Sequence, residues 1–346
     1  MEIQNSLTGK VVLENDAYVE KLTNNNDKAK GTVESNKGYV GAVDGKDKES
    51  VTATQSGYIL EIGTYDQLVN FRNKVNSGAS YSGMTVKLTA DIDISERAWT
   101  PIGAAYRDTT SPNFHVFQGT FDGNRHTISG LTNTGFKIAS AFKGSNKTTP
   151  AGYGEYVFGL FGSVYNATIK DIVMANVNID LGCDEKEKVV GDSIGAIVGF
   201  AAGDQVTIAG CKVISGSIVG YDAVAGIIGR SYSAKTTINE CENAATVTAI
   251  RRACGILGFA SFPEAKDVAI TGCKNSGNVK QTGTPTTDPA GKRAEGDYGY
   301  YKVAGLAIYQ KGSGNEITIK GSTNKGTVTL TVPEEGKNKS DTVLYS

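Results

Sequence analysis

A short pattern recurs five times between residues 158 and 308 and limits the possible folds more than any other feature of the chain. Each copy has two adjacent apolar residues preceded by a glycine, or in one copy an alanine, and followed in four copies by a glycine. The copies are Phe158–Gly162, Gly195–Gly199, Ala225–Gly229, Cys254–Gly258 and Ala304–Ile308.

A β-branched segment ending in isoleucine follows each copy, and a further short alternating segment closes the unit. The isoleucines are Ile169, Ile208, Ile238, Ile270 and Ile319, so successive units are 39, 30, 32 and 49 residues apart. A period near thirty residues with turns of varying length is typical of a solenoid, in which each repeat buries its apolar face against its neighbours.

The type of solenoid follows from the residues within each unit. Three runs rich in Val, Ile, Thr and Gly lack the apolar spacing of a helix and are separated by Gly, Asn and Ser turns. We therefore predict an all-β fold, a right-handed parallel β-helix with three short strands per coil, over residues 85–332, with the repeats at 157–332. Residues 1–57 are predicted to be a polar β or attachment segment, 58–84 a capping-helix region and 333–346 a C-terminal tail.

The residue three positions after each isoleucine is small or apolar. These residues are Ile172, Cys211, Cys241, Cys273 and Ser322. Equivalent residues of successive coils stack about 4.8 Å apart, so we predict that the three cysteines form one buried ladder. Stacked, parallel Cβ vectors suit a disulfide poorly, so the ladder is predicted to be unbridged. Cys183 and Cys254 have no evident partner, which leaves the redox compartment open.

Residues 64–78 carry the clearest helix signal. Thr64 and Gln67 have capping-box spacing, and Leu68, Phe71 and Val75 then fall on one helical face. A β-helix has an open first rung, so we predict that this amphipathic helix caps it, with Trp99 packing nearby. The C-terminal end has no such helix. It is predicted to be covered by the tail 343–345, by the N-terminal segment or by another chain.

The repeated motif, spelled GLFG at residues 159–162, resembles the GLUG repeat of bacterial surface proteins, including IgA-protease-like and adhesin-like proteins. Residues 64–103 and 117–131 also resemble segments that precede such repeats in Bacteroides-type gut bacteria. The resemblance covers roughly residues 58–332 and implies a surface protein with this architecture, without implying an activity. Ile308 departs from the pattern at the second glycine, which predicts altered geometry in the final rung.

Charge and hydropathy exclude two classes of partner. The 346 residues include 35 Lys and Arg against 36 Asp and Glu, a formal charge of −1, so no basic stripe for nucleic acid is expected. No apolar run approaches the roughly eighteen residues of a membrane span. The first 16 residues lack the pattern of a signal peptide, so either a leader was removed or the protein never had one.

Residues with catalytic potential are scarce. The only histidines are His115 and His126, and the His-Glu-x-x-His motif of zinc peptidases does not occur. Acidic residues fall mostly beside turns and do not recur in register, as a pair of glycosidase carboxylates would have to. Asp91 and Asp93 could bind Ca²⁺, but a solvated strand face is the favoured interpretation. We predict no enzymatic activity, no cofactor and no metal.

The long insertions, at residues 137–156, 181–193 and 281–302, all precede a Gly-x-x-Gly copy. In a solenoid such insertions lie along one edge, which we predict to be the ligand-binding surface, through exposed tyrosines and arginines. The alternative is that these loops vary only because variation is tolerated there. The residues predicted to bind ligand are Tyr153, Tyr156, Tyr221, Arg251, Arg252, Tyr298, Tyr300 and Tyr301.

The function predicted from these features is that of a non-catalytic, secreted or cell-surface, adhesin-like rod that binds a glycan or a host or bacterial surface protein. Two alternatives stay open. One is a polysaccharide lyase or hydrolase of the pectate-lyase-like architecture. The other is a bacteriophage appendage located in the virion, which the exposed C-terminal end favours because an oligomer could form through it.

Overall fold

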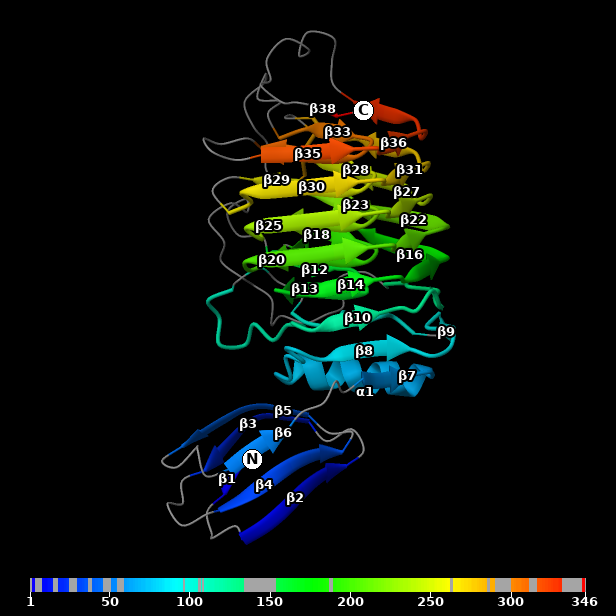
Figure 1. The fold of residues 1–346 in the computed structure, drawn as a ribbon. Coiled ribbons are helices and arrows are strands. Elements are labelled where there is room, and N and C mark those ends of the chain that lie inside the picture. The colour runs from blue at the N-terminus through cyan, green and yellow to red at the C-terminus, as the bar shows by residue number, and fades with distance from the viewer. Residues whose placement is uncertain are drawn as a thin grey trace.

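Most of the chain forms a parallel β-solenoid whose coils stack along one axis (Figure 1). The computed structural model describes residues 2–3, 8–14, 18–24, 30–36, 39–45, 51–54, 59–133, 154–289, 300–310, 316–331 and 344–345, except positions 96, 105, 106, 108, 187, 188, 262, 263, 285 and 286. The solenoid contains five sheets, called S1 to S5 in the order in which one coil passes through them.

The strands of each sheet are as follows. S1 contains β12 (Gly154–Phe158), β18 (Val189–Gly195), β23 (Val224–Ala225), β28 (Arg252–Cys254) and β33 (Lys302–Ala304), with β17 (Cys183–Asp184) antiparallel to β18. S2 contains β13 (Phe161–Tyr165), β19 (Val198–Ala202), β24 (Ile228–Ser231), β29 (Leu257–Ser261), β34 (Ala307–Gln310) and β38 (Leu344–Tyr345). S3 contains β7 (Ile59–Ile62), β8 (Thr85–Leu88), β10 (Thr120–Asp122), β14 (Thr168–Lys170), β20 (Gln205–Ala209), β25 (Lys235–Asn239), β30 (Asp267–Thr271) and β35 (Glu316–Lys320).

The last two sheets complete the coil. S4 contains β9 (Ile92–Asp93), β11 (Thr127–Ser129), β15 (Val173–Ala175), β21 (Lys212–Val213), β26 (Glu242–Asn243), β31 (Lys274–Asn275) and β36 (Thr323–Asn324). S5 contains β16 (Val177–Leu181), β22 (Gly216–Gly220), β27 (Thr246–Ala249), β32 (Val279–Gln281) and β37 (Val328–Leu330). A complete coil therefore has five short strands, and the expectation of three is wrong.

The Gly-x-x-Gly copies account for part of this difference. Each copy is a bend between an S1 strand and an S2 strand: β12, for example, ends at Phe158 and β13 begins at Phe161. The sequence pattern joined two strands that the bend separates. In the last copy Ile308 replaces the glycine, and the pairing of β29 with β34 shifts register there, as its departure from the pattern predicted.

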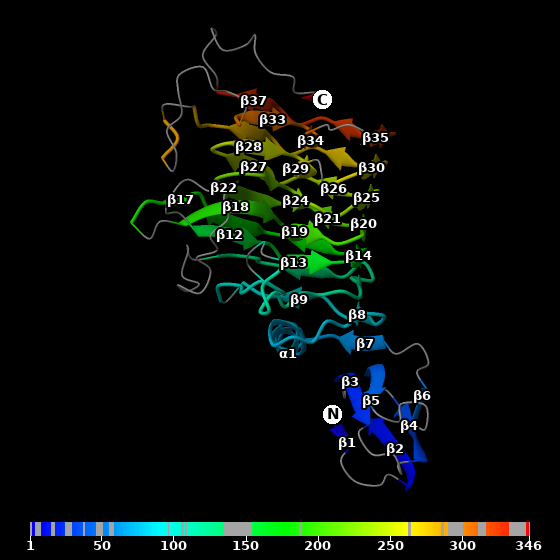
Figure 2. The same ribbon diagram turned by 90° about the vertical axis from the view of Figure 1, so that its left-hand side faces the viewer.

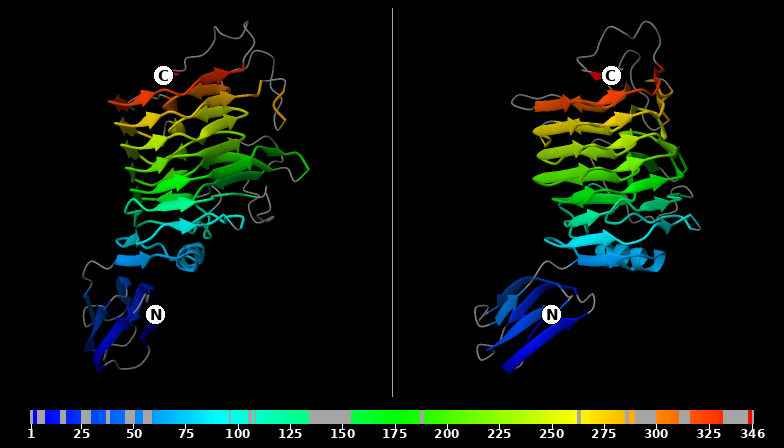
Figure 3. Two further views of the ribbon diagram at one scale, coloured as in Figure 1. Left: turned by 90° about the vertical axis from the view of Figure 1, so that its right-hand side faces the viewer. Right: turned by 45° about the vertical axis from the view of Figure 1, so that its right-hand side comes forward.

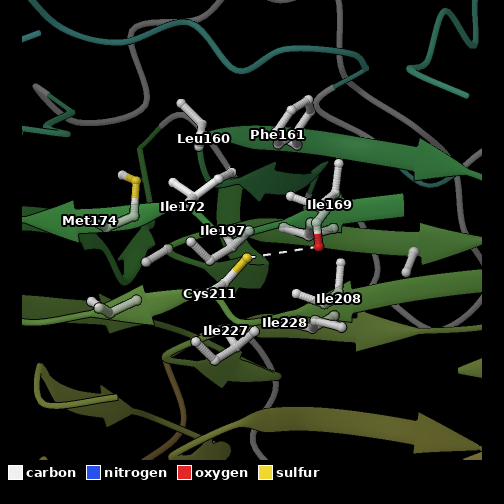
Figure 4. Packing of buried hydrophobic residues seen from close by; sticks show 14 of the residues in the cluster. Leu160, Phe161, Ile169, Ile172, Met174, Ile197, Ile208, Cys211, Ile227 and Ile228 are labelled. Atoms are coloured by element: carbon white, nitrogen blue, oxygen red, sulfur yellow. Dashed lines mark hydrogen bonds between the residues drawn. The ribbon is translucent and has the colours of Figure 1, made fainter. Parts of the chain in front are cut away.

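The repeat register read from the isoleucines is confirmed. Ile169, Ile208, Ile238, Ile270 and Ile319 are Cα partners in successive parallel pairs of S3. The cysteine ladder is also confirmed, because Cys211, Cys241 and Cys273 are buried and unbridged. Each thiol approaches a carbonyl oxygen of the previous coil, as Cys211 Sγ does at 3.8 Å from the oxygen of Ile169 (Figure 4).

A second ladder, of asparagines, lies inside the last three coils. Asn243 Nδ2 donates to Asn275 Oδ1 at 2.8 Å, and Asn275 Nδ2 donates to Asn324 Oδ1 at 2.7 Å. This ladder explains the first glycine of three motif copies. A Cβ on Gly226, Gly255 or Gly305 would lie within 2.4 Å of the asparagine side chain of its own coil.

Helix α1 (Tyr65–Asn76) closes the first end of the solenoid, below β8 in Figure 1. The Thr64 hydroxyl accepts a hydrogen bond from the Gln67 amide at 3.3 Å, and Leu68, Phe71 and Val75 are buried, which confirms the predicted cap. Phe71 packs against the rings of Phe117 and Tyr81. Trp99 is buried as expected, and its indole N–H donates to the Leu160 carbonyl at 3.0 Å.

The other end is partly covered by the C-terminal tail, one of the three covers expected for it. Strand β38 pairs antiparallel with β34 at the edge of S2. Beyond α1 lie two three-stranded parallel sheets of the N-terminal segment (Figure 2). They are β1 (Glu2–Ile3), β3 (Tyr18–Asn24) and β5 (Tyr39–Gly45), and β2 (Thr8–Glu14), β4 (Lys30–Asn36) and β6 (Val51–Thr54). This segment is thus itself built of parallel strands.

Replacing Asn275 with alanine should destabilise the protein, since Asn275 is the central member of the asparagine ladder. The substitution leaves Asn324 Oδ1 and the Gly277 carbonyl without their donor. We expect the free energy of unfolding to fall by about 2–4 kcal/mol in urea titrations. The matched control is Asn239→Ala on the outer face of β25, which should cost less than about 0.5 kcal/mol. Equal effects of the two substitutions would contradict the structural role of the ladder.

Candidate functional site

The described parts of the insertions lie along one side of the solenoid. The β17–β18 hairpin projects from that side, and residues 287–289 lie on the same side nearer the C-terminal end (Figures 2 and 3). The shared edge is therefore confirmed for these two insertions. Residues 137–153 of the first insertion are outside the described residues.

The strands beneath this edge are buried on both faces. In S3 and S5 burial alternates along the strand, as in β20, because one face is the core and the other meets solvent. In S1 and S2 nearly every residue of β18, β19 and β29 is buried. Other side chains therefore cover the outer face of S1 and S2, as Phe114 and Tyr232 do where they pack against Phe200.

Asp288 ties the third insertion to this face. Its carboxylate accepts hydrogen bonds from the Tyr221 hydroxyl at 2.7 Å, from Arg251 Nε at 2.6 Å and from the Tyr301 hydroxyl at 3.0 Å. The Arg251 guanidinium also lies 4.6 Å from the centroid of the Tyr221 ring. Asp288 is fully buried, so we infer that this contact fixes the loop.

The structure thus brings together several of the residues predicted to bind ligand, but it buries most of them. Tyr156, Tyr221, Arg251, Arg252 and Tyr301 are buried, so the expectation that their side chains are exposed is wrong. These side chains are buried because other side chains pack over the outer face of S1 and S2. Tyr300 remains 39% exposed. Tyr153 and Tyr298 lie outside the described residues, and a binding role for any member of the set stays a prediction.

A network of buried charges, which we call the ion ladder, crosses the coils on the same face. It consists of Arg107, Glu155, Asp192, Asp222, Arg230 and Arg252. Arg107 contacts Glu155 and lies 3.1 Å from Asp192. Arg230 lies 3.3 Å from both Asp192 and Asp222, and Arg252 lies 2.7 Å from Asp222. Three arginines thus balance three carboxylates, as buried charges require.

Aromatic rings line the ion ladder. The Arg252 and Arg230 guanidiniums lie 4.0 Å and 5.1 Å from the centroid of the Phe259 ring. Tyr232 lies close to Arg107 and Arg230, 5.7 Å and 5.8 Å from its ring centroid. These contacts give the planar guanidiniums favourable faces to stack on where water is excluded.

A β-bulge places Asp192 in the ion ladder. In the pairing of β12 with β18, Tyr156 is opposite Gly191 and Val157 is opposite Ser193, so Asp192 is the extra residue. Sequence reasoning missed the ion ladder because it sought carboxylates at equivalent strand positions. Asp192 is an extra residue in a bulge and Arg107 precedes the repeats, so neither occupies an equivalent strand position. The available signal was the presence of Asp192 and Arg230 inside otherwise apolar runs.

The two carboxylates held by Arg107 titrate in opposite directions. Burial, with the nearby Asp192 charge, raises the pKa of Glu155 above its ordinary value. Burial alone would also raise the pKa of Asp192, but Arg107 and Arg230 together lower it. Burial also raises the pKa of the Cys254 thiol to about 12, so this thiol stays protonated near neutral pH.

The remaining candidates for chemistry have structural partners. His126 Nδ1 lies 3.1 Å from Asp91 Oδ1, which also accepts the Thr127 amide, whereas Asp93 accepts the Ser95 amide. His115 Nδ1 lies 2.9 Å from the Asn76 carbonyl oxygen. Among the described residues no group of three His, Cys, Asp or Glu side chains could hold a metal ion. In the same part of the chain no helix is both long and apolar enough to cross a membrane.

Comparisons with known proteins identify a fold relative. No family model and no curated protein matches the chain. Among solved structures it is similar to a Bacteroides ovatus protein described as a "putative immunoglobulin A1 protease". The two are 19% identical with a TM-score of 0.50 over 78% of this chain and 67% of that chain. At this identity the likeness shows a shared fold and carries no information about activity.

Substitutions at the two carboxylates of the ion ladder should differ in effect. Asp192→Asn removes the carboxylate shared by Arg107 and Arg230, so the free energy of unfolding should fall by about 3–5 kcal/mol at neutral pH. Glu155→Gln should cost less, because burial disfavours the Glu155 charge and the amide can still accept from Arg107.

Urea unfolding at several pH values tests the signs of both shifts. The pKa of Glu155 is raised, so its contribution to stability is present below its ordinary value of 4.5 and lost as the pH rises through the folded pKa. The pKa of Asp192 is lowered, so its contribution is present above 3.8 and lost as the pH falls through the folded pKa. For each variant, the loss of unfolding free energy relative to the unsubstituted protein is followed against pH. The two losses should change with pH in opposite directions, and changes of the same sign would contradict the assignment.

Proposed function

We propose that this protein is a non-catalytic, secreted or cell-surface, adhesin-like protein, whose β-solenoid is a rigid scaffold for loops that bind a glycan or another protein. The observation that carries the proposal is the ion ladder. The charged side chains nearest the insertions are buried and engaged with one another, which suits a fixed scaffold. Tyr300, at the end of the third insertion, presents an exposed ring beside them.

The fold similarity supports a secreted or cell-surface location only indirectly. The Bacteroides ovatus protein shares the architecture, and the GLFG motif resembles the repeats of bacterial surface proteins. Membership of the GLUG-repeat group, the right-handed sense of the coil and assembly through the C-terminal end stay predictions.

One observation favours a second candidate, a polysaccharide hydrolase. Neighbouring carboxylates whose pKa values are shifted apart, as those of Glu155 and Asp192 are, suit a general acid and a base. Both are buried against Arg107, however, and in this arrangement they cannot approach a sugar. We therefore prefer the non-catalytic proposal.

A binding and product screen separates the two. The purified protein would be applied to a glycan array and to immobilised immunoglobulin A1, and the same ligands would be incubated with it and analysed for cleavage. We expect binding to at least one ligand with no new reducing ends, unsaturated ends or peptide fragments. Cleavage that is lost in Asp192→Asn and Glu155→Gln variants of intact fold would support the hydrolase instead.

A further inference from the structure

The positive end of the charge network lies beside the exposed ring of Tyr300. The Arg251 and Arg252 guanidiniums are 5.8 Å and 5.9 Å from the Tyr300 ring centroid. Lys302, two residues after Tyr300, is the register partner of Arg252 in the pairing of β28 with β33 and is only partly buried. Two guanidiniums therefore lie near the Tyr300 ring, and Lys302 follows two residues later, opposite Arg252 in the strand pair.

The described carboxylates do not balance these cations. Asp288 pairs with Arg251, and Asp222 is shared between Arg230 and Arg252. The ion ladder, with three arginines and three carboxylates, is neutral. Arg251, Lys302 and Asp288 add two positive charges and one negative charge, which leaves one net positive charge among the described residues. No described residue forms an ion pair with Lys302, whose side chain is only partly buried.

A second observation concerns Arg251. Its Nη2 atom is buried and no described residue accepts a hydrogen bond from it, although its Nε is paired with Asp288. Buried donors are nearly always satisfied, so we infer that this one takes an acceptor from outside the described residues. Burial and the charge of Arg252 also lower the pKa of Lys302, and a bound anion would offset both effects.

We propose that Tyr300 and Lys302 bind a carboxylated glycan, with Lys302 on the sugar carboxylate and the Tyr300 ring stacked on the sugar. The buried guanidiniums of Arg251 and Arg252 contribute positive potential, which the low dielectric around them screens weakly. A sugar fits better than an acidic peptide because an exposed ring beside cations offers both a stacking face and a charge. This inference rests on the proposed glycan-binding function and names the ligand class for it.

The test compares oligogalacturonate with the same oligosaccharide after its carboxylates have been reduced to alcohols, by isothermal titration calorimetry at low and at high salt. We expect the reduced ligand to bind about tenfold more weakly, as loss of one charge-assisted contact predicts. Binding of the carboxylated ligand should weaken with salt. Lys302→Gln should abolish the difference between the two ligands, and Tyr300→Ala should weaken both. Tyr300→Phe, which keeps the ring, should bind nearly as the unsubstituted protein does.

The control is Lys320→Gln, an exposed lysine in S3, which should leave both affinities unchanged, with thermal unfolding followed to confirm that every variant folds. Equal affinity for the two oligosaccharides would overturn the carboxylate assignment and leave glycan binding intact. Binding of poly-glutamate without binding of oligogalacturonate would overturn the choice of a sugar. Absence of any ligand in the wider array and immunoglobulin screen would overturn the proposed function together with this inference.

Discussion

The parallel pairing of successive coils is the interaction on which the rest of the structure depends. Apart from the bulge in β12–β18 and the shift in β29–β34, each coil hydrogen-bonds to the next in one register, so residues at equivalent positions become neighbours about 4.8 Å apart. The same rule explains the isoleucine column of S3, the thiols of Cys211, Cys241 and Cys273, and the asparagine ladder. Like side chains suit this geometry when they are apolar or when, as in asparagine, each offers both a donor and an acceptor.

Charged side chains do not suit this stacking of equivalent positions, because identical charges would lie directly over one another. On the outer face of S1 and S2 the protein resolves this conflict by alternating sign and by breaking register. The bulge at Asp192 and the arrival of Arg107 from an earlier segment place Asp192 between Arg107 and Arg230. With other side chains packed over it, this face becomes a second packed layer outside the core, and the binding surface that we propose lies at its margin, at Tyr300 and Lys302.

Period and residue type were enough to predict the solenoid, the isoleucine register, the cysteine ladder and the α1 cap, because each depends on residues that recur or on local capping chemistry. They were not enough for the site. Tyr221 and Arg251 resemble exposed binding residues in sequence, and only the contact with Asp288, 37 residues after Arg251, shows that they are buried. Likewise, the bend at Gly159 could not be told from a strand, since glycine between apolar residues is compatible with both.

The central claim is that the arginines of the ion ladder are part of the scaffold. Arginine modification by phenylglyoxal, with each site quantified by mass spectrometry of the native protein, tests it most directly. The account predicts rapid modification of the exposed Arg97 and Arg125, and modification of Arg107, Arg230 and Arg252 only after unfolding. Modification of these three at the rate of the exposed arginines in the folded protein would contradict the claim.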